Sequence, residues 1–387
     1  MAGLLLARCG VRVLVLEKHG DFLRDFRGDT IHPSTLQILH ELGLMDEFQK
    51  IGFSKVARAQ LEDSQGKRVT VVDLASLKHP YPFIAMAPQW DFLNLLAEAA
   101  AKEPSFELRL NCEADELLFN QEQVIGVRYR SAAGQGEAFA RLTIAADGRW
   151  SKMREQAELP VRDAKVPIDV WWFRVSGTHR VAESLLPAFG PKRVYALIPR
   201  RGYVQAARLL LKGQDGILRQ RGIEKFRAEF REDVPALAQG IEKLELEDLK
   251  LLEVRVNLAS RWWRRGFLGI GDAVHAMSPA GGVGVNLAVQ DAVCAARLLA
   301  TPLATGHITD RDVAAVQRRR YLPTITIQSI QRIMHRGLRR ILEQDTSLTL
   351  PAMVGTVLER VPWLSRIPAR LLGVGLLRER PPQAARR

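Results

Sequence analysis

The chain has 387 residues, 47% of them hydrophobic and 26% charged, which allows roughly two or three globular domains. It contains no charge-free apolar stretch long enough to predict a membrane-spanning helix, and its three dispersed cysteines argue against a zinc site or a disulfide framework and fit a reducing cytoplasm. The net charge of +13 comes from scattered basic residues without a nucleic-acid-binding motif, so we expect a solvated basic surface, or one that attracts anionic cofactors, substrates or membranes, and no nucleic-acid partner.

The N-terminal residues predict a helix followed by a buried strand. Residues 1–7 are apolar but lack the basic leader of a signal peptide, and residues 11–17 form an apolar run that ends in Glu17. In a dinucleotide-binding βαβ unit, a GxGxxG turn precedes a ribose-binding acid by about 20 residues. If Gly3 is the third of these glycines, Glu17 has this spacing; otherwise Glu17 merely ends a strand. The opening strand and two glycines would then precede Met1, so we expect a misassigned start codon or a truncated chain rather than a natural deletion, which would leave buried backbone groups unpaired.

A polar loop at residues 25–33 leads into a helix that begins at Pro33. The loop contains Arg27, which could hold a phosphate or be an ordinary surface arginine. A second helix is predicted over residues 89–102. Its N-terminus, at Gln89, favours a nearby anion, although Gln89 could equally be a simple capping residue.

Short strands are predicted before and after the second helix, at residues 57–62, 69–73, 106–111, 114–119, 124–130 and 142–146. A glycine-containing loop is expected at residues 132–136. The last of these strands is followed by Asp147 and Gly148, then by Ser151 and Arg154. An Asp-Gly pair is common in turns, so this pair alone carries little information.

Between residues 166 and 257 the pattern changes to strands joined by tight turns, with a helix predicted over residues 216–231. Successive residues of a strand point to opposite faces, so Trp171 and Phe173 share one face and Trp172 takes the other. The candidates for lining an apolar substrate pocket are Trp171, Phe173, Tyr195, Tyr203 and Gln205. For each of them the alternative is ordinary sheet core.

The most informative segment begins with a predicted strand at residues 267–270 and ends with a predicted helix at residues 286–299. Asp272 follows the strand, and a glycine-rich turn precedes the helix. An acid at a strand end can hold sugar hydroxyls, and glycines and a helix N-terminus suit close approach of a negatively charged ligand. These features favour a large anionic cofactor. His275, inside this segment, could relay protons or could be a structural hydrogen-bond partner, which is the commoner role.

Beyond residue 299 the sequence predicts helices at residues 311–321, 326–342 and 354–377, the last broken by Pro362 and Pro368. Arginines scattered among apolar residues make these helices basic and amphipathic. They could pack on the domain or on a second subunit, or make a weak peripheral contact with an acidic membrane. The protein could be a monomer or a homodimer, and we expect residues 381–387 to be a disordered tail.

The order of these motifs resembles the FAD-dependent aromatic hydroxylases, the p-hydroxybenzoate hydroxylase-like flavoprotein monooxygenases. Residues 271–286 are similar to the GD motif of that family, residues 142–154 to its DG motif, and residues 1–4 to the end of its GPAGL sequence. The resemblance implies an α/β fold, with a Rossmann-like, glutathione-reductase-like FAD-binding domain, an inserted mixed β-sheet substrate domain and a helical C-terminus.

The resemblance also implies residue roles. Asp272 would bind the ribitol chain, Pro279 would line the flavin ring, and the backbone of residues 281–286 would face its pyrimidine edge. Asp147 would brace the cofactor phosphates, and Gln89 would touch the phosphate or ribityl region. The expected cofactor-binding residues are Gly3, Glu17, Lys18, Arg27, Gln89, Asp147, Gly148, Gly271, Asp272, Pro279, Gly281, Gly282, Gly284, Val285 and Asn286.

We expect three regions by analogy with this family. The FAD-binding domain would comprise residues 1–55, 89–165 and 253–310. The substrate-binding domain would comprise residues 56–88 and 166–252, and a helical region would comprise residues 311–387.

The implied activity is hydroxylation of an aromatic or polyketide-like small molecule, with FAD as cofactor, NADH or NADPH and O2 as co-substrates, and a C4a-hydroperoxyflavin as intermediate. No residue is assigned as a catalytic base, His275 is a weak candidate, and no metal is expected. One alternative is another flavin oxidoreductase of the same fold: a halogenase, whose Trp-x-Trp motif we do not find, a ring reductase or a quinone-pathway hydroxylase. The other is a flavin-free remnant that acts only as a binding protein.

Overall fold

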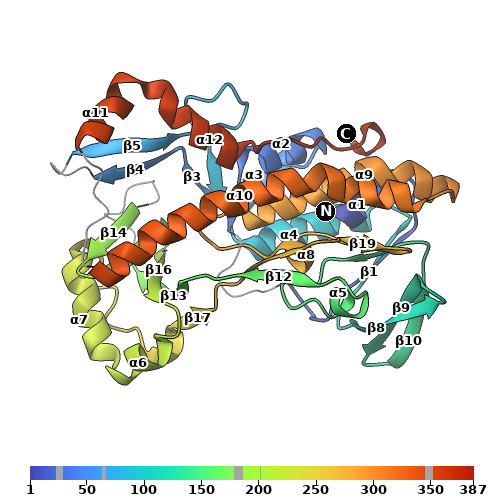
Figure 1. Cartoon of the computed structure of the whole chain (residues 1–387), viewed down its shortest axis with the longest axis horizontal. Helices are drawn as coiled ribbons and strands as arrows, with labels where there is room; N and C mark the ends of the chain where they lie inside the picture. The colour runs from blue at the N-terminus through green and yellow to red at the C-terminus, as the bar shows by residue number, and fades with distance from the viewer. Residues whose placement is uncertain (23–28, 63–66, 178–185, 201, 345–351) are drawn as a thin grey trace.

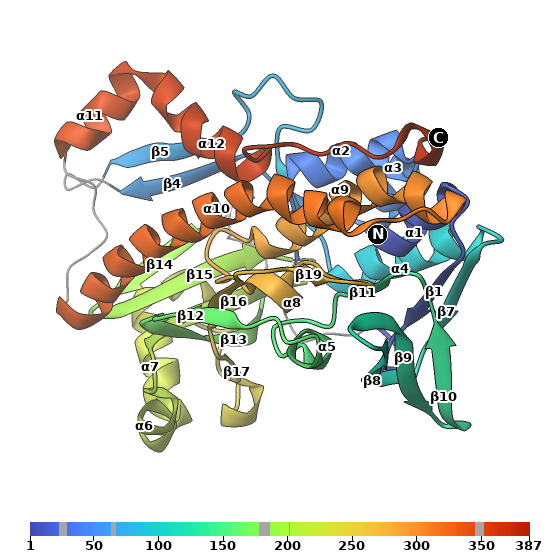
Figure 2. The ribbon, with the colours of Figure 1, turned by 45° about the vertical axis from the view of Figure 1, so that its right-hand side comes forward.

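The computed structural model describes the chain except for residues 23–28, 63–66, 178–185, 201 and 345–351. Helices and sheets form distinct layers in it (Figure 1). The long helices α9 (Gly284–Thr305) and α10 (Asp310–Gln344) lie side by side across the molecule, with the larger sheets below them and the strands of residues 58–73 above them in both views (Figure 1, Figure 2). This arrangement confirms the expected α/β class with a helical C-terminal part.

Two parallel strand pairs carry the expected nucleotide-binding motifs. Strand β1 (Val13–Leu16) pairs with β7 (Phe106–Arg109), and β11 (Thr143–Ala145) pairs with β20 (Phe267–Gly269), which continues antiparallel to β19 (Trp263–Arg264). The two pairs form separate sheets among the described strands. Whether an opening strand precedes the first residue stays a prediction.

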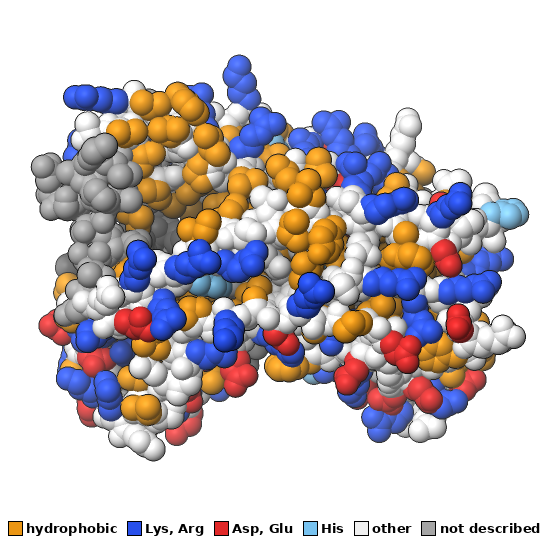
Figure 3. Space-filling model, viewed as in Figure 1, with side chains coloured by type: hydrophobic (Ala, Val, Ile, Leu, Met, Phe, Trp, Pro, Cys, Tyr) orange, Lys and Arg blue, Asp and Glu red, His pale blue; other side chains and the backbone are white. Residues whose placement is uncertain are grey.

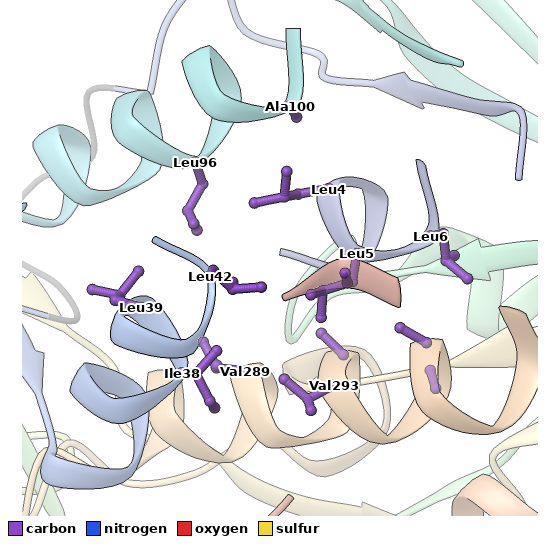
Figure 4. Packing of buried hydrophobic residues seen from close by; sticks show 14 of the residues in the cluster. Leu4, Leu5, Leu6, Ile38, Leu39, Leu42, Leu96, Ala100, Val289 and Val293 are labelled. Carbon is purple, nitrogen blue, oxygen red and sulfur yellow. The ribbon is translucent and has the colours of Figure 1, made fainter. Parts of the chain in front are cut away.

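Helix α1 (Ala2–Arg8) packs between helices of the core. Its Leu4, Leu5 and Leu6 are buried against residues from α2 (Pro33–Glu41), α4 (Gln89–Ala101) and α9. Figure 4 shows Leu5 pointing toward Val293 of α9 and Leu4 pointing toward Leu96 of α4. Since a Cβ on Gly3 would lie 2.9 Å from the Phe106 ring and 3.1 Å from Val15, only glycine lets α1 pack this closely on β1 and β7.

The remaining elements of the first half are short. Helix α3 (Met45–Ile51) follows α2, and a small sheet has the order β2 (Thr30–Ile31), β6 (Ile84–Met86), β3 (Ser54–Val56). Strands β4 (Arg58–Glu62) and β5 (Arg68–Asp73) form a hairpin, as expected. A further sheet contains β8 (Glu113–Asn120), β9 (Gln123–Ser131) and β10 (Gly134–Phe139).

Strand β10 corrects the loop expected at residues 132–136. The backbone of Gly134 to Phe139 pairs in register with β9 from Ser131 to Gly126, so the loop is only a tight turn. Glycines at 134 and 136 weakened the strand pattern in the sequence, but pairing with β9 compensates for their low strand propensity.

A five-stranded sheet occupies the region between the DG and GD motifs. Its order is β14 (Leu186–Gly190), β15 (Arg193–Pro199), β16 (Tyr203–Leu211), β13 (Ile168–Ser176) and β17 (Lys250–Leu252). Helix α7 (Ile223–Asp233) covers one face. The helix expected over residues 216–231 is two helices, α6 (Asp215–Gln220) and α7, because the chain turns at Gly222 with φ +80°. Strand β12 (Val161–Ala164) pairs with β18 (Val256–Ala259). Helix α5 (Lys152–Gln156) packs on β8, and a 3-10 turn at Pro235–Leu237 packs on α7.

The C-terminal helices differ from expectation at two prolines. Helix α10 runs without interruption through Pro323, because its buried residues pack along α9 and outweigh the one backbone hydrogen bond that proline removes. Helix α11 (Ala352–Arg360) is followed by a 3-10 turn (Pro362–Ser365) and α12 (Arg366–Gly373). Pro362 therefore breaks the segment as expected, but Pro368 lies in the first turn of α12, where its missing N–H costs little.

The expected disordered tail is wrong. A short turn at Gln383–Ala385 packs against the N-terminal helices, and Ala385 is fully buried. Arg8 donates to the Ala385 carbonyl, and the Arg387 amide donates to the Glu41 carbonyl at 3.2 Å. These backbone partners hold the last residues in place.

Among the described helices, one, α9, is long and apolar enough to cross a membrane. More than half of its residues are buried between α1 and α10 in this fold, which accounts for its apolar character as that of a core helix.

Candidate cofactor and substrate site

The GD motif forms a sharp exit from β20. Gly271 has φ +59°, and its amide donates to the buried Asp291 carboxylate at 3.1 Å. The short helix α8 (Asp272–His275) follows, and the Gly282 amide donates to the Pro279 carbonyl at 2.9 Å to close a turn. The sequence thus folds as expected, from strand through glycine turn to helix.

The N-terminus of α9 lacks a side-chain cap. Among the described residues, none caps it with a side chain, and its first turn contains no acid. The first amides of a long helix are unpaired donors at the positive end of the helix dipole. A Cβ on Gly284 would meet no atom within 4 Å, so the space beside these amides is open. The site can therefore accept a flat, negatively charged ring edge.

The side chain of Asn286 is engaged within the protein. Its Oδ1 accepts from the His32 amide at 2.9 Å and from Thr35 Oγ1 at 2.7 Å, and its Nδ2 donates to the Thr30 and Gly282 carbonyls. Asn286 thus fixes the glycine turn against β2 and α2, and only its backbone is available to a ligand.

Gly282 makes a close contact with β2. Its φ is +61°, and a Cβ there would lie 2.5 Å from Thr30 Oγ1, which donates to the Gly282 carbonyl at 2.7 Å. Any larger residue would push the turn away from β2.

The structure brings the DG and GD motifs together. Strands β11 and β20 are parallel neighbours, so Asp147 and Asp272 follow them at the same edge. Arg149 lies 3.5 Å from the Asp272 carboxylate, and buried Arg154 donates to the Ala273 carbonyl. A Cβ on Gly148, with φ +84°, would meet no atom within 4 Å. Asp147 is exposed and accepts from the Met153 amide at 3.2 Å.

Glu17 directly follows β1, whose ladder with β7 continues through it. Its amide donates to the Arg109 carbonyl, and its carboxylate accepts from the His19 amide at 3.0 Å. Lys18 is exposed beside it. Their roles toward the adenosine part of a dinucleotide stay predictions, and so does that of Arg27, which lies outside the described residues.

A carboxylate of the chain itself lies at the N-terminus of α4, and the role of Gln89 toward a cofactor stays a prediction. Asp29 accepts from the Gln89 amide at 3.2 Å and from Arg200, whose Nη2 lies 2.5 Å from Asp29 Oδ2. Burial raises the pKa of Asp29, and the Arg200 charge opposes this rise. The helix dipole at Gln89 is therefore already matched by a carboxylate of the chain itself.

His275 has the geometry of a structural residue. It is 1% exposed, stacks near Trp262 with ring centroids 4.8 Å apart, and its Nε2 lies 2.5 Å from Asp291 Oδ2. Arg320 contacts the other oxygen of Asp291 at 2.9 Å. Burial acts to raise the pKa of Asp291, but His275 and Arg320 outweigh it and lower the pKa. This arrangement favours the structural interpretation over proton relay.

Three of the five pocket candidates lie on the face of the sheet that α7 covers. Trp171, Phe173 and Tyr195 are buried against Phe226 and Phe230 of α7, with ring centroids 5.2 to 5.8 Å apart in the contacting pairs. They form an aromatic core between sheet and helix, so a substrate cannot reach them without displacing α7.

The opposite face carries Tyr203 and Gln205, and with them Trp172, which the candidate set omitted. Cross-strand pairing places Trp172 beside Ala207, and Arg174 beside Gln205. Trp172 packs with Ile198 of the same sheet and with Val56 and Met86 of the β2–β6–β3 sheet. Its buried Nε1 has no hydrogen-bond partner in the described structure. The alternation of side chains along β13 predicted that Trp172 and Trp171 point to opposite faces of the sheet. It did not predict which of these faces α7 covers; the amphipathic pattern of α7 was the one signal in the sequence for that.

Taken together, these residues fit a flavin dinucleotide. Uncapped α9 amides, positive-φ glycines at 148, 271 and 282, and acids at two neighbouring strand ends form an open, donor-rich surface. No cluster of His, Cys, Asp or Glu suited to a metal ion occurs in the described part of the chain.

Comparison with known proteins agrees with this geometry. A family model described as an FAD binding domain matches residues 1–321. The chain is 30% identical to 6-methylpretetramide 4-monooxygenase of Streptomyces rimosus over 321 residues, which cover 82% of this chain and 76% of the relative. Among solved structures, anhydrotetracycline hydroxylase OxyS of Streptomyces rimosus has a TM-score of 0.74 at 21% identity. The match covers 96% of this chain and 73% of the OxyS chain. The myxobacterial chondrochloren halogenase CndH has a TM-score of 0.75 at 18% identity, and the match covers 99% of this chain and 95% of the CndH chain. This likeness shows a shared fold.

The matching model spans most of the chain, and a relative at 30% identity spans most of both proteins. This protein is therefore an FAD-dependent oxidoreductase with NAD(P)H as co-substrate, and it belongs to the FAD-binding-domain family of aromatic monooxygenases, the p-hydroxybenzoate hydroxylase-like flavoproteins.

Proposed function

We propose that this enzyme hydroxylates an aromatic or polyketide-like small molecule, with NAD(P)H and O2 as co-substrates. Bound FAD would supply the redox chemistry: a hydride from NAD(P)H and one proton reduce O2, so that one oxygen atom enters an aromatic C–H bond and the other leaves as water. The protein would contribute binding, orientation and exclusion of water.

One observation carries this proposal: the uncapped N-terminus of α9 directly after the Pro279–Gly282 turn. Reduced flavin holds negative charge at its pyrimidine edge, and fixed amides at the positive end of a helix stabilise such charge without reorganisation. Asn286 and Thr30 hold the turn rigidly enough for this role.

The substrate side follows from a short chain of contacts. Thr30 of β2 bonds Gly282, its β-ladder partner Met86 lies on β6, and Met86 packs in the same apolar cluster as Trp172 and Ile198. The Trp172 face of the five-stranded sheet, which also packs against Ile341 and Leu342 of α10, is thus one small sheet away from the glycine turn. An apolar surface with one unpartnered indole N–H suits an aromatic compound that presents a hydrogen-bond acceptor.

The relatives support the substrate class. The similar enzyme from Streptomyces rimosus is named for a pretetramide, and the similar structure from the same organism is named for anhydrotetracycline. We infer a fused or substituted phenolic ring system as the substrate of this chain.

The test is oxygen consumption and product mass. Purified protein loaded with FAD is expected to oxidise NAD(P)H faster when a phenolic or polyketide-like aromatic is added, and to yield a product heavier by one oxygen atom. A product that appears only with halide would indicate a halogenase, and oxidation without O2 would indicate a reductase. Substrate binding by a protein that takes up no FAD would indicate a binding protein, and each of these outcomes contradicts the proposal.

Trp172 gives a sharper test with a control on the same strand. Trp172→Phe keeps a ring but removes the unpartnered N–H, so the KM for the aromatic substrate is expected to rise roughly tenfold, the value of one hydrogen bond. Trp171→Phe loses its hydrogen bond to Asp215 on the α7 face and should leave KM unchanged. Equal KM values in the two variants would place the substrate elsewhere.

A further inference from the structure

Exposed apolar side chains gather on the C-terminal helices. Trp363 is 57% exposed and Ile367 is 55% exposed, and three further large apolar residues are exposed nearby: Val357, Leu376 and Leu377. Arginines at 360, 366 and 370 are exposed among them. We call these eight residues the C-terminal surface. Helices α11 and α12 both contact the 3-10 turn that carries Trp363, so these three elements are neighbours in the fold.

Helix α12, which carries part of this surface, packs closely on the protein with its inner side. Its buried Ala369 and Gly373 face the β4–β5 hairpin and the start of α2, and a Cβ on Gly373 would lie 2.7 Å from Leu74 and 3.2 Å from Pro33. Small residues on the inner side allow this close packing, while Arg366, Ile367 and Arg370 point outward. The exposure of Ile367 is therefore a property of the folded helix.

The charged residues that follow Arg360, around Trp363 and Ile367, are of one sign. From residue 361 to residue 378 the sequence contains three arginines and no acid. Figure 3 shows orange apolar side chains over this end of the molecule with blue basic side chains around them. An apolar face flanked by arginine and tryptophan is typical of elements that lie in the interface of an acidic bilayer.

We propose that the C-terminal surface binds the surface of an anionic lipid membrane, with Trp363 and Ile367 at the headgroup boundary and the arginines on lipid phosphates. A second copy of the chain fits this surface less well. A twofold dimer would bring the same arginines of both copies together, on proteins that each carry a net charge of +13. The proposal concerns where the enzyme works and does not depend on which ring it hydroxylates.

Vesicle cosedimentation of the full-length FAD-loaded protein tests this. The protein is expected to bind vesicles of phosphatidylglycerol mixed with phosphatidylcholine, to release as salt is raised, and to ignore vesicles of phosphatidylcholine alone. Failure to bind the acidic vesicles at low salt would overturn the proposal.

Paired variants identify the surface. Trp363→Ser with Ile367→Ser is expected to lower vesicle affinity by at least roughly tenfold, and Arg366→Gln with Arg370→Gln by roughly fivefold per charge. The matched controls are Phe139→Ser with Ile217→Ser, at exposed apolar sites on β10 and α6, and Arg221→Gln with Lys225→Gln near α7. Equal losses in the controls would contradict a specific surface.

Sedimentation velocity separates the remaining outcome. The protein is expected to keep one sedimentation coefficient whether or not the C-terminal surface is altered. A dimer that dissociates when Trp363 and Ile367 are replaced would show that a second copy covers this surface and would overturn membrane docking. Unchanged thermal unfolding of the variants confirms that they are folded.

Discussion

Asp291 is a buried carboxylate that binds three groups from distant parts of the chain. It accepts from the Gly271 amide and from His275, and it pairs with Arg320, which also lies 3.8 Å from the buried Glu379. Each ion lacks water, so each depends on the others for its solvation. The network ties the GD motif to α10 and to the C-terminal segment.

Asp291→Asn is expected to lower the free energy of unfolding by about 3 kcal/mol, because it leaves the Arg320 cation buried with only Glu379 at 3.8 Å and the Leu377 carbonyl as partners. It should also weaken FAD retention, since Asp291 holds the amide of Gly271 directly before Asp272, the acid predicted to bind the ribitol chain. Urea unfolding and flavin content measure the two effects. Glu343→Gln, in an exposed i,i+4 pair with Arg339, is the control and should cost less than about 1 kcal/mol. Equal costs would show that the network contributes nothing.

His32 makes stability depend on pH. Its Nδ1 donates to the Leu372 carbonyl at 2.8 Å, and burial lowers its pKa from 6.5 to about 4. Between these values the unfolded chain binds a proton that the folded chain does not, so the free energy of unfolding falls by about 1.4 kcal/mol per pH unit as pH decreases. His32→Gln should reduce this slope by about one proton in urea unfolding series. An unchanged slope would show that His32 is protonated in the folded state.

At the scale of elements, the glycine turn before α9 is the part that a ligand would meet first. It combines two positive-φ glycines, a hydrogen bond to β2 and an uncapped helix of 22 residues. The turn and helix are local in sequence, and their shape follows from glycine positions and from the apolar period of α9. The contact with Thr30, by contrast, joins residues 252 positions apart.

Gly282→Ala tests the turn. An added Cβ would clash with Thr30 Oγ1 and strain a backbone at φ +61°, so we expect a loss of about 2 kcal/mol in stability and at least tenfold weaker FAD binding. Gly213→Ala has a similar φ of +83° with no atom within 4 Å of the new Cβ. It should cost about 1 kcal/mol and leave FAD binding as it was. Flavin fluorescence titration of the two variants measures their FAD affinity. If both variants lost the same affinity, backbone strain would be the cause and the contact with Thr30 would not matter.

At the scale of the whole molecule, the five-stranded sheet and the motif-bearing half are joined by an ion pair. Arg200, directly after β15, reaches Asp29, which precedes β2 and accepts from the first amide of α4. Both side chains are largely buried, at 5% and 16% exposure. The pair therefore positions the five-stranded sheet against the half of the chain that carries the DG and GD motifs.

Arg200→Gln should lower the free energy of unfolding by about 3 kcal/mol at neutral pH, because it leaves Asp29 buried without its cation. The pKa of Asp29, already raised by burial, would rise further. Protonation then relieves the penalty, so the difference from wild type should shrink as pH falls. Arg231→Gln, from an exposed pair with Glu242, is the control for urea unfolding at both pH values. A loss that is independent of pH would argue against the charge on Asp29.

Much of the fold and part of the site could be predicted from sequence. The strand, turn and helix of residues 267–299, the DG turn and the opposite orientation of Trp171 and Trp172 all follow from periods and turn residues within a few positions. These features are local, so the chain determines them wherever it folds.

Tertiary structure alone decided which face of the five-stranded sheet α7 covers, that α10 continues through Pro323, and that Asp29 lies at the N-terminus of α4. In each case the deciding free energy comes from contacts between distant segments: α7 with the aromatic sheet face, α10 with α9, and Arg200 with Asp29. The local hydrophobic pattern does not predict which distant segment will pack on a given face, because a face becomes buried only when another element covers it.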